Sequence, residues 1–293
     1  MKLVGMMACR NEGWVLGLSA RIALLWCDEL VIGLHACTDE SSNIAHQIAY
    51  EHPNRVLILM QTDPAWHEMQ HRQAMLSAAR GLNATHVAII DADEIVTGNI
   101  VHELRGEIEK MYPGHIFQLP LYNLRHGIEK YHANGLWGNR IVSVAFVDDP
   151  LLHWGGDNFH HREPRGARLI PWWRATFAGV MHLWGANERR LLAKHALYKV
   201  VERTRWPNKS VAEIDAMYSQ CVKGAMYLTA DKRWLHSDEK WTFAAVPPEW
   251  WQPAYNGYAL DLQAEPWQEA EVRRIVAEHG AEMFKGLDLF GVV

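Results

Sequence analysis

The sequence lacks the features that mark several large classes of protein. Its 293 residues include only four cysteines, none spaced as C-x-x-C, so we expect neither a disulfide framework nor a cysteine-based metal site. No apolar run approaches the roughly 18 residues that a membrane-spanning helix needs. Neither G-x-x-x-x-G-K-[ST] nor G-x-G-x-x-G occurs, which removes the commonest kinase and dehydrogenase signatures. We therefore expect a soluble, cytoplasmic protein without a transmembrane segment.

The sequence also lacks an excess of positive charge. It has 29 Lys and Arg against 34 Asp and Glu, a formal net charge of −5, which disfavours generic binding of polyanions. One stretch departs from this balance, because residues 185–209 hold seven Lys or Arg and two Glu. Hydrophobic residues make up 49% of the chain and charged residues 22%, as is usual for a globular protein with a sizeable core.

Apolar strands alternate with helical patterns along the first part of the chain. This alternation predicts βαβ units and therefore an α/β fold, Rossmann-like, with a mixed but mainly parallel sheet flanked by helices. We expect one domain at residues 1–205 and a mainly helical C-terminal extension, packed on it, at residues 206–293. The strands expected first are 3–8, 29–34, 56–60, 87–91, 115–123, 140–147 and 177–182. The helices expected are 15–26, with Asn11 as its cap, 42–51, 68–80, 99–111, 192–201, 211–229 and 266–279.

The best candidate for a functional site follows the apolar run at residues 87–90. Asp91, Asp93 and Glu94 close that run in the sequence D-A-D-E. Acids two positions apart share a face of a strand, and at a strand end their oxygens suit one hard cation. Ligands of open α/β sheets bind at the carboxyl ends of strands. The alternative is that Asp91 and Asp93 are solvated turn residues.

Four short motifs carry a family resemblance. They are Arg10-Asn11-Glu12, C-T-D-E-S at 37–41, H-R-Q at 71–73 and D-A-D-E at 91–94. In their order and spacing, residues 1–190 resemble the family 2-like glycosyltransferases, which have the nucleotide-sugar-binding type A fold. The resemblance implies an enzyme that moves a sugar from a nucleoside diphosphate sugar, with UDP-sugar expected, to an acceptor hydroxyl with inversion. It also implies Mn²⁺ or Mg²⁺ as cofactor.

The resemblance assigns roles to individual residues. Asp93, assisted by Asp91, would hold the metal ion that bridges the two phosphates. His182, in V-M-H-L-W, matches a late strand that often supplies a third metal ligand, although a lone histidine is as often structural. The residues expected at the nucleotide or its diphosphate are Arg10, Glu12, Asp39, Arg72, Asp91, Arg189 and Lys194. Arg189 and Lys194 have a second interpretation, the solvated face of a helix. Cys37 stands where the family has Ser, which leaves the nucleotide base open.

An inverting transfer also needs a carboxylate that accepts the proton of the acceptor hydroxyl. Asp157, in W-G-G-D-N, and Glu163, in H-H-R-E, are the candidates. The two glycines before Asp157 favour it, because they permit close approach of a substrate. The alternative for either acid is an ion pair with Arg162 or Arg165. A saccharide, a lipid-linked sugar or a modified nucleobase would suit a Trp-rich loop beside a basic helix as acceptor.

Two other functions share parts of this pattern. Haloacid dehalogenase-like phosphatases also place D-x-D after a strand, and Asp148-Asp149 would then be their later acidic motif. Ile95 and the position after a fourth strand, rather than a first, disfavour that assignment. A non-catalytic nucleotide- or carbohydrate-binding protein is the other alternative.

Overall fold

The computed structural model describes residues 1–138, 140–156, 161–169, 178–223, 226–228, 234–236, 240–252, 255 and 257–293. The chain divides into two compact units. The first comprises Met1–Leu121, Ile141–His182 and Pro247–Asp261, and the second comprises Tyr122–Arg140, Leu183–Val246 and Leu262–Val293. Each unit is discontinuous in sequence, so this division differs from a single boundary at residue 205.

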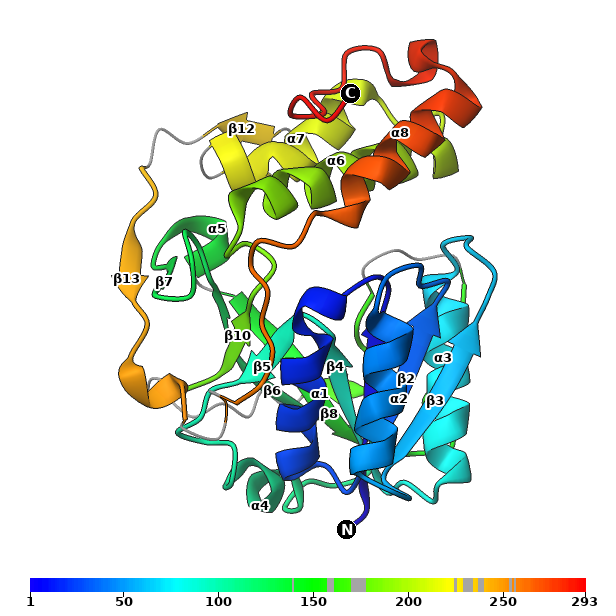
Figure 1. Ribbon diagram of the computed structural model, residues 1–293, viewed down its shortest axis with the longest axis vertical. Helices are drawn as coiled ribbons and strands as arrows, with labels where there is room; N and C mark the ends of the chain where they lie inside the picture. Colours follow the sequence, from blue (N-terminus) through cyan, green and yellow to red (C-terminus); the bar gives the residue numbers. More distant parts are fainter. Residues whose placement is uncertain are drawn as a thin grey trace. The chain divides into compact units, whose positions relative to one another are not determined.

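The first unit is built on strands that alternate with helices (Figure 1). Its elements are β1 (Leu3–Cys9), α1 (Gly13–Trp26), β2 (Glu29–His35), α2 (Ser41–Glu51), β3 (Val56–Gln61), α3 (Glu68–Gly81), β4 (His86–Asp91), β5 (Glu94–Val96), α4 (Leu104–Ile108), β6 (His115–Asn123), β8 (Arg140–Val147), β9 (Arg168–Leu169), β10 (Val180–His182) and a 3-10 turn at Pro248–Trp250. The expected strands begin and end within one residue of β1, β2, β3, β4, β6 and β8.

One mixed sheet organises the first unit. Among the described residues, nine strands form it in the order β3-β2-β1-β4-β8-β6-β10-β5, with β9 beside β6. The first four strands of this order are parallel neighbours, and the register places Cys9 opposite Leu34 and Ala8 opposite Asp91. β8 is antiparallel to β4. The loops after β1, β2, β3 and β4 therefore meet at one edge, and the expected α/β fold is confirmed.

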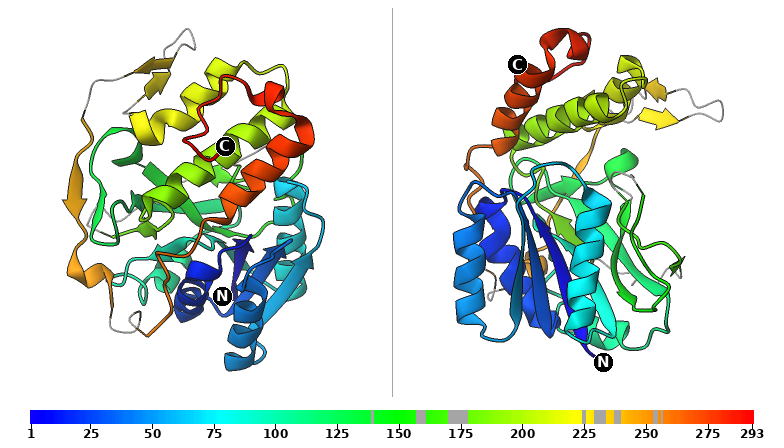
Figure 2. Two further views of the ribbon diagram at one scale, coloured as in Figure 1. Left: turned by 45° about the horizontal axis from the view of Figure 1, so that its top comes forward. Right: turned by 90° about the vertical axis from the view of Figure 1, so that its right-hand side faces the viewer.

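Helices cover both faces of this sheet. α1 and α2 lie on one face and α3 on the other (Figure 2). Val87 and Ile89 of β4 belong to a core cluster with Met75 and Leu76 of α3. Because alternate residues of a strand share a face, Asp91 also points to the α3 face. The periodicity of β4 thus decides which helix can contact the first acid of D-A-D-E.

The second unit is mainly helical, as expected for the C-terminal part of the chain. Its elements are β7 (Lys130–His132), α5 (Gly135–Gly138), α6 (Glu188–Arg205), α7 (Val211–Lys223), β11 (Met226–Leu228), β12 (Trp234–His236), β13 (Phe243–Ala245), α8 (Trp267–His279) and a 3-10 helix at Ala281–Phe284. β11 pairs with β12 and β13 pairs with β7, both antiparallel. In the part of the chain that the structure describes, no helix combines the length and apolarity required to cross a bilayer.

Three expected local features were wrong. α7 ends at Lys223 rather than at residue 229, because Met226–Leu228 pairs with β12 instead of continuing the helix. α4 covers only Leu104–Ile108, because the preceding residues form turns, such as that from Ile100 N–H to Thr97 C=O. Asn11 is not the cap of α1, because the residue that precedes the helix is Glu12 and the Asn11 side chain bonds to the loop after β2.

Candidate functional site

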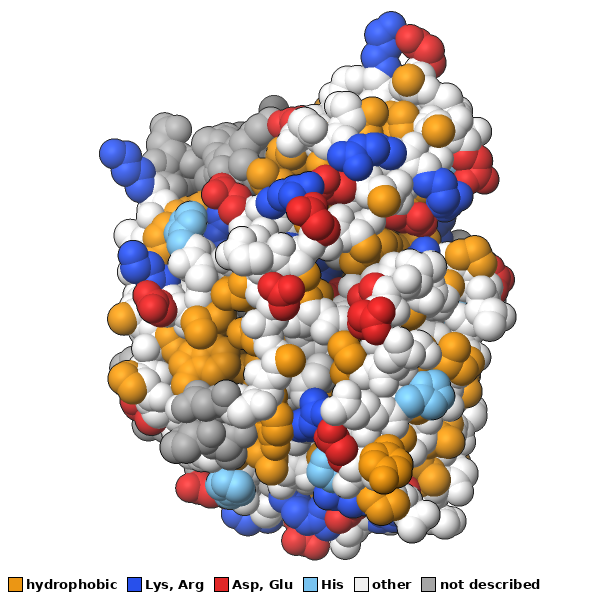
Figure 3. Space-filling model, viewed as in Figure 1, with side chains coloured by type: hydrophobic (Ala, Val, Ile, Leu, Met, Phe, Trp, Pro, Cys, Tyr) orange, Lys and Arg blue, Asp and Glu red, His pale blue; other side chains and the backbone are white. Residues whose placement is uncertain are grey.

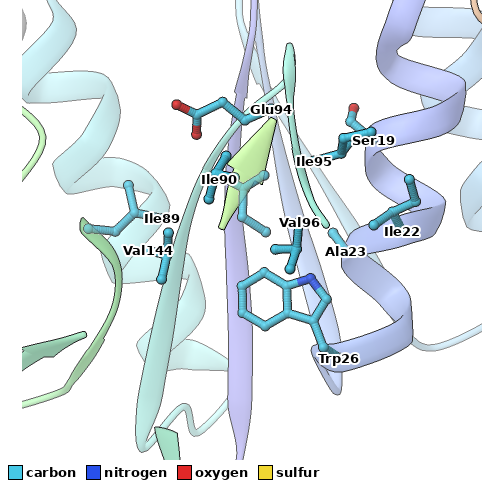
Figure 4. Close-up of a pocket in the computed structure, with 11 residues that line it drawn as sticks. Ser19, Ile22, Ala23, Trp26, Ile89, Ile90, Glu94, Ile95, Val96 and Val144 are labelled. Atoms are coloured by element: carbon cyan, nitrogen blue, oxygen red, sulfur yellow. The ribbon is translucent and has the colours of Figure 1, made fainter. Parts of the chain in front are cut away.

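The D-A-D-E residues form the connection between β4 and β5. Asp91 ends β4, Glu94 begins β5, and Asp93 between them is only 4% exposed. Glu94 is also buried, and one of its carboxylate oxygens accepts from the Asp91 N–H at 3.3 Å. Figure 4 shows the Glu94 carboxylate turned away from the apolar side chains with which Glu94 lines a pocket. The connection is therefore a buried polar cluster rather than a solvated turn.

Arg162 binds the acids of this cluster with its two terminal nitrogens. Nη1 lies 3.0 Å from Asp91 Oδ2 and 2.9 Å from Glu94 Oε1, and Nη2 lies 2.7 Å from Glu94 Oε2. Nη2 also donates to Ile89 C=O at 2.7 Å, and Nε donates to Ser143 C=O at 2.6 Å. A bidentate guanidinium–carboxylate pair of this kind is strong and directional. Arg162 thus joins β4, β5 and β8 at the site.

Charge and burial oppose each other at the two acids that Arg162 contacts. Burial raises the pKa of Asp91, but Arg162 and Arg72 outweigh it, so this pKa lies below its ordinary value. Arg72, on α3, places Nη2 3.4 Å from Asp91 Oδ1. Burial raises the pKa of Glu94 above its ordinary value, and Arg162 offsets only part of that rise. The two guanidinium groups therefore keep Asp91 ionised at the end of β4, where its side chain is 34% exposed.

Asp93 and His182 form a second pair in the same cluster. β10 is antiparallel to β5 and places His182 opposite Glu94. His182 Nε2 lies 3.6 Å from Asp93 Oδ2. A carboxylate oxygen and an imidazole nitrogen are suitable ligands for Mn²⁺, and Mg²⁺ commonly takes one or two carboxylates plus phosphate oxygens and water. The Asp93–His182 pair therefore fits part of a metal site.

The third predicted ligand is placed differently. Both carboxylate oxygens of Asp91 accept hydrogen bonds from guanidinium groups, one from Arg72 and one from Arg162. No group of three or more His, Cys, Asp and Glu side chains able to hold a metal ion occurs among the described residues. The structure thus brings Asp91, Asp93 and His182 together, while the assisting role of Asp91 toward a metal ion stays a prediction.

The loops after β1 and β2 are tied to each other. Asn11 has a left-handed backbone, with φ of 53°, which Asn tolerates better than most residues. Its Oδ1 accepts from the N–H groups of Thr38 at 2.6 Å and Asp39 at 3.3 Å. Asp39 in turn accepts from Gly13 N–H at 2.9 Å. Glu12 is buried and accepts from the Trp14 indole. Asp39 and Glu12 fix these loops, and their contacts with a nucleotide stay predictions.

An aromatic and basic cluster at the same edge was not predicted. The Arg10 guanidinium lies 4.4 Å from the centroid of the Trp66 ring. His35 packs edge-on against Trp66 at 5.7 Å and against His71 at 4.1 Å. Burial, with the charges of Arg10 and His71, lowers the pKa of His35 to about 4. The available signals were a histidine at the end of β2 and a tryptophan before α3.

Of the two candidate bases, the structure describes Glu163 and not Asp157. Glu163 accepts from Ser143 Oγ at 2.8 Å, and Ser143 Oγ in turn accepts from Gln118 at 3.1 Å. Arg162 directs its guanidinium to Asp91 and Glu94, whereas Glu163 has a hydroxyl contact with Ser143. Asp157 lies outside the described residues. Glu163 is thus placed directly after the arginine that binds D-A-D-E.

A cavity lies beside the segment expected to face the acceptor. It has a volume of about 750 Å³, and α3 residues including Gln70 and Gln73 line it together with Trp154, Gly155 and Gly156. Trp154 itself is 3% exposed, and its indole packs edge-on against Phe146 at 5.9 Å. Trp154 is therefore a core residue rather than an open stacking surface.

Arg189 and Lys194 belong to the second unit. Arg189 pairs with Glu265 at 2.6 Å and with Glu269 at 2.6 Å, and these hydrogen bonds raise its pKa further above the ordinary value. The Lys194 ammonium lies 5.3 Å from the centroid of the Trp184 ring. On the face shown in Figure 3, acidic and basic side chains are interspersed rather than gathered by sign. These contacts match the solvated-face interpretation, and roles at a diphosphate stay predictions.

Asp91 and Asp148, the two acids that a phosphatase would use together, lie far apart along the sheet. Val147, before Asp148, pairs with His86 at the start of β4, whereas Asp91 ends that strand. Five strand residues span about 16 Å. Asp148 is also held by Arg80, with both contacts at 2.8 Å. Asp148 therefore cannot act with Asp91 on one substrate atom in this arrangement.

Comparisons with known proteins give a distant structural likeness. No protein-family model matches the chain, and no curated protein matches it. The crystal structure of S. aureus TarS 1–349 aligns with a TM-score of 0.43 and 11% identity, over 76% of this chain and 71% of that chain. The crystal structure of TarS 1–349 in complex with UDP aligns with a TM-score of 0.44 and 11% identity, over 76% of this chain and 71% of that chain. Another crystal structure of S. aureus TarS aligns with a TM-score of 0.45 and 10% identity, over 76% of this chain and 43% of that chain. Similarity at this level assigns neither a family nor an activity to this chain.

Proposed function

We propose that the first unit binds a nucleoside diphosphate sugar, with UDP-sugar expected, and transfers the sugar to an acceptor hydroxyl with inversion. The observation that carries this proposal is the buried D-A-D-E connection at the carboxyl end of β4. There Asp93 lies beside His182, and Arg162 holds the neighbouring acids. The loops after β1, β2 and β3 reach the same edge, where ligands of open α/β sheets bind.

Asp93 and His182 are the residues that would hold Mn²⁺ or Mg²⁺. A bound ion of this kind would neutralise the charge of the diphosphate leaving group. Asp91 would assist Asp93 at the ion, and Arg72 and Arg162 hold its carboxylate in place. A carboxylate fixed in this way can also orient water or donor hydroxyl groups by accepting hydrogen bonds. Arg162 is a positioning residue, because it holds β4 and β5 in place through Asp91, Glu94 and a β4 carbonyl.

Proton transfer requires a carboxylate on the acceptor side. In an inverting displacement the hydroxyl attacks from the face opposite the diphosphate, so its proton leaves on that face. Asp157 is the preferred base and Glu163 the second candidate. The two glycines before Asp157 are the reason for this preference, and the hydrogen bond from Ser143 to Glu163 fits a fixed loop residue as well as a base. The acceptor classes expected are a saccharide, a lipid-linked sugar and a modified nucleobase.

A panel of nucleotides tests this function. Thermal unfolding would be followed with UDP, GDP, CDP, TDP and ADP, each with Mn²⁺ and with excess chelator. A ligand at a hundred times its Kd stabilises the protein by about 2.7 kcal/mol, so a specific nucleotide raises the melting temperature measurably. We expect UDP with Mn²⁺ to give the largest rise. No rise with any nucleotide, combined with turnover of p-nitrophenyl phosphate, would instead support a phosphatase.

A further inference from the structure

Two cysteine residues contact each other at the sheet edge of the first unit. Cys9 is the last residue of β1 and is 3% exposed, whereas Cys37 follows the end of β2 and is partly exposed. Cys9 lies opposite Leu34 in the parallel pairing, so the loop that leaves His35 returns toward the end of β1. The Cys37 thiol donates to Cys9 C=O, with Sγ 3.5 Å from the carbonyl oxygen, so the two residues are in direct contact.

The surroundings of the pair make its members chemically unequal. The Asn11 N–H donates to Cys37 Sγ at 3.4 Å, and Asn11 is itself held by Thr38. The hydrogen bond from Cys9 lowers the pKa of Cys37, burial opposes this, and the Asn11 N–H adds to the lowering, with a result of about 7. The same contact and burial raise the pKa of Cys9. Cys37 is therefore the nucleophile and Cys9 the thiol that resolves it.

We propose that Cys9 and Cys37 form a reversible disulfide when the protein meets a peroxide, which makes this edge a redox modification site. The Cys37 thiolate attacks one peroxide oxygen, so an S–O bond forms, the O–O bond breaks and the departing hydroxide takes up a proton to become water. Cys9 sulfur then attacks Cys37 sulfur, an S–S bond forms and the S–O bond breaks. The hydroxide that leaves takes the Cys9 proton, so the two thiols supply two electrons and two waters are released.

The modification has a local consequence. A disulfide sulfur is a weaker hydrogen-bond acceptor than a thiolate, so oxidation weakens the hydrogen bond that Cys37 accepts from the Asn11 N–H. Asn11 joins the loop after β1 to Thr38 and Asp39 after β2. We expect oxidation to loosen this junction and to weaken UDP binding. That last expectation rests on the proposed function, whereas formation of the disulfide does not.

Cys27 provides a control within the same chain. It is buried, and burial raises its pKa far above the ordinary value, so we expect it to remain a thiol. The full chain would be treated with hydrogen peroxide, blocked with N-ethylmaleimide and digested under non-reducing conditions. Trypsin alone leaves Cys27 and Cys37 on one peptide, because no Lys or Arg occurs between Arg21 and Arg55. A second digestion with a Glu-specific protease separates them at Glu29.

The expected result is a cross-linked pair of peptides that contains Cys9 and Cys37, lighter than their sum by two hydrogens and separated by dithiothreitol. Cys27→Ser should leave the link unchanged. Cys9→Ser should let Cys37 proceed to sulfinic acid, and Cys37→Ser should leave Cys9 as a thiol. A link to Cys27, or equal over-oxidation of Cys37 in the wild type and in Cys9→Ser, would overturn the proposal.

UDP binding of the reduced and oxidised protein separates the two proposals. If the reduced wild type binds no UDP while the disulfide forms, the proposed function fails and the redox site stands. If the reduced protein binds UDP and no disulfide forms, the redox site fails and the function stands. A disulfide that leaves UDP affinity unchanged would contradict the expected loosening of the Asn11 junction.

Discussion

Both units bury charged side chains, but they do so in different settings. In the first unit the charges lie where strands end, with Arg162 in contact with Asp91 and Glu94. In the second unit they lie along the length of α6, which buries Arg190, Lys199 and Glu202. Lys199 Nζ lies 2.7 Å from Asp215 Oδ1 and 2.7 Å from Asp288 C=O. Glu202 accepts from Lys209 at 2.8 Å and from Tyr218 at 2.9 Å.

The contrast indicates which buried charges serve a reaction. The partners of Lys199 and Glu202 come from helices and terminal segments of the same unit, so these charges join packed elements. The charges of the first unit lie at the edge where four strand-end loops meet, and they include Asp93, which lies beside His182. We therefore expect substitutions at the strand ends to change catalysis, and substitutions of the buried charges of α6 to change stability alone.

The largest effect is expected from Asp93→Asn. The substitution removes a negative ligand and no apolar contact, so the melting temperature should change little while transfer is lost. A metal ion at a leaving group contributes several kcal/mol, which is about a hundredfold or more in turnover. Kinetics with a UDP-sugar and Mn²⁺, beside UDP titration, would measure both consequences. Wild-type turnover in this variant would contradict the role of Asp93 as a metal ligand. It would also contradict the expectation that the charges at the strand ends serve catalysis.

The next effect concerns the base. Asp157→Asn should lower turnover by roughly 10²- to 10⁴-fold while donor affinity stays nearly constant, because general base catalysis contributes that much. Glu163→Gln should be milder. The anomeric configuration of the product should be determined in parallel. A retained configuration would count against a single-base mechanism, and a larger loss in Glu163→Gln would transfer the role to that residue.

A pair of buried-charge variants compares the units directly. Arg162→Gln leaves Glu94 without its guanidinium and Asp91 with that of Arg72 alone, and it should cost about 3–5 kcal/mol in unfolding free energy, with loss of turnover. Lys199→Met should cost a similar free energy and leave UDP affinity unchanged. Chemical denaturation and UDP titration would measure the two properties.

The double variant Arg162→Gln, Glu94→Gln provides the control for this pair. It removes one uncompensated carboxylate, so part of the lost stability should return without full activity. Equal stability of the single and double variants would show that the charge of Glu94 is not what Arg162 balances. Loss of UDP binding in Lys199→Met would contradict the division of roles between the units.

The smallest effect is expected in the pH dependence of stability, to which one buried histidine in each unit contributes. Burial, with nearby cations, lowers the pKa of His35 and of His132 to about 4 each, against about 6.5 in an unfolded chain. The unfolded chain then binds more protons between these values, so stability is complete above about pH 6.5 and declines as the pH falls toward 4. His35→Gln and His132→Gln should each make this decline shallower. Only His35→Gln should alter the affinity for UDP. Equal changes of UDP affinity in His35→Gln and His132→Gln would contradict the different roles of the two units.

Much of the fold was predictable because its signals are local. Apolar runs bounded by polar residues placed β1 to β4 within one residue of their observed ends, and the alternation with helices predicted the parallel arrangement. Helix ends were less predictable, because they depend on distant partners. α7 ends where its following residues pair with β12, and Asn11 bonds across to Thr38 rather than to its own helix.

The candidate site was predictable in position but not in its charge balance. D-A-D-E after an apolar run indicated the strand end, and His182 was expected beside it. The pairing of Arg162 with Glu94 joins residues 68 positions apart, and no sequence pattern distinguishes it from an ion pair with the adjacent Glu163. The basic residues of 185–209 predicted an exposed helix face, whereas Arg190 and Lys199 are buried, because helical periodicity in a polar segment does not reveal which face packs.

Calorimetric titration of the wild-type protein with UDP, with Mn²⁺ and then with excess chelator, tests the central claim most directly. If the Asp93–His182 pair forms part of a metal–diphosphate site, binding should be measurable with Mn²⁺ and lost in chelator. Asp93→Asn should match the chelated wild type under both conditions. Equal UDP affinity with Mn²⁺ and with chelator would contradict the account.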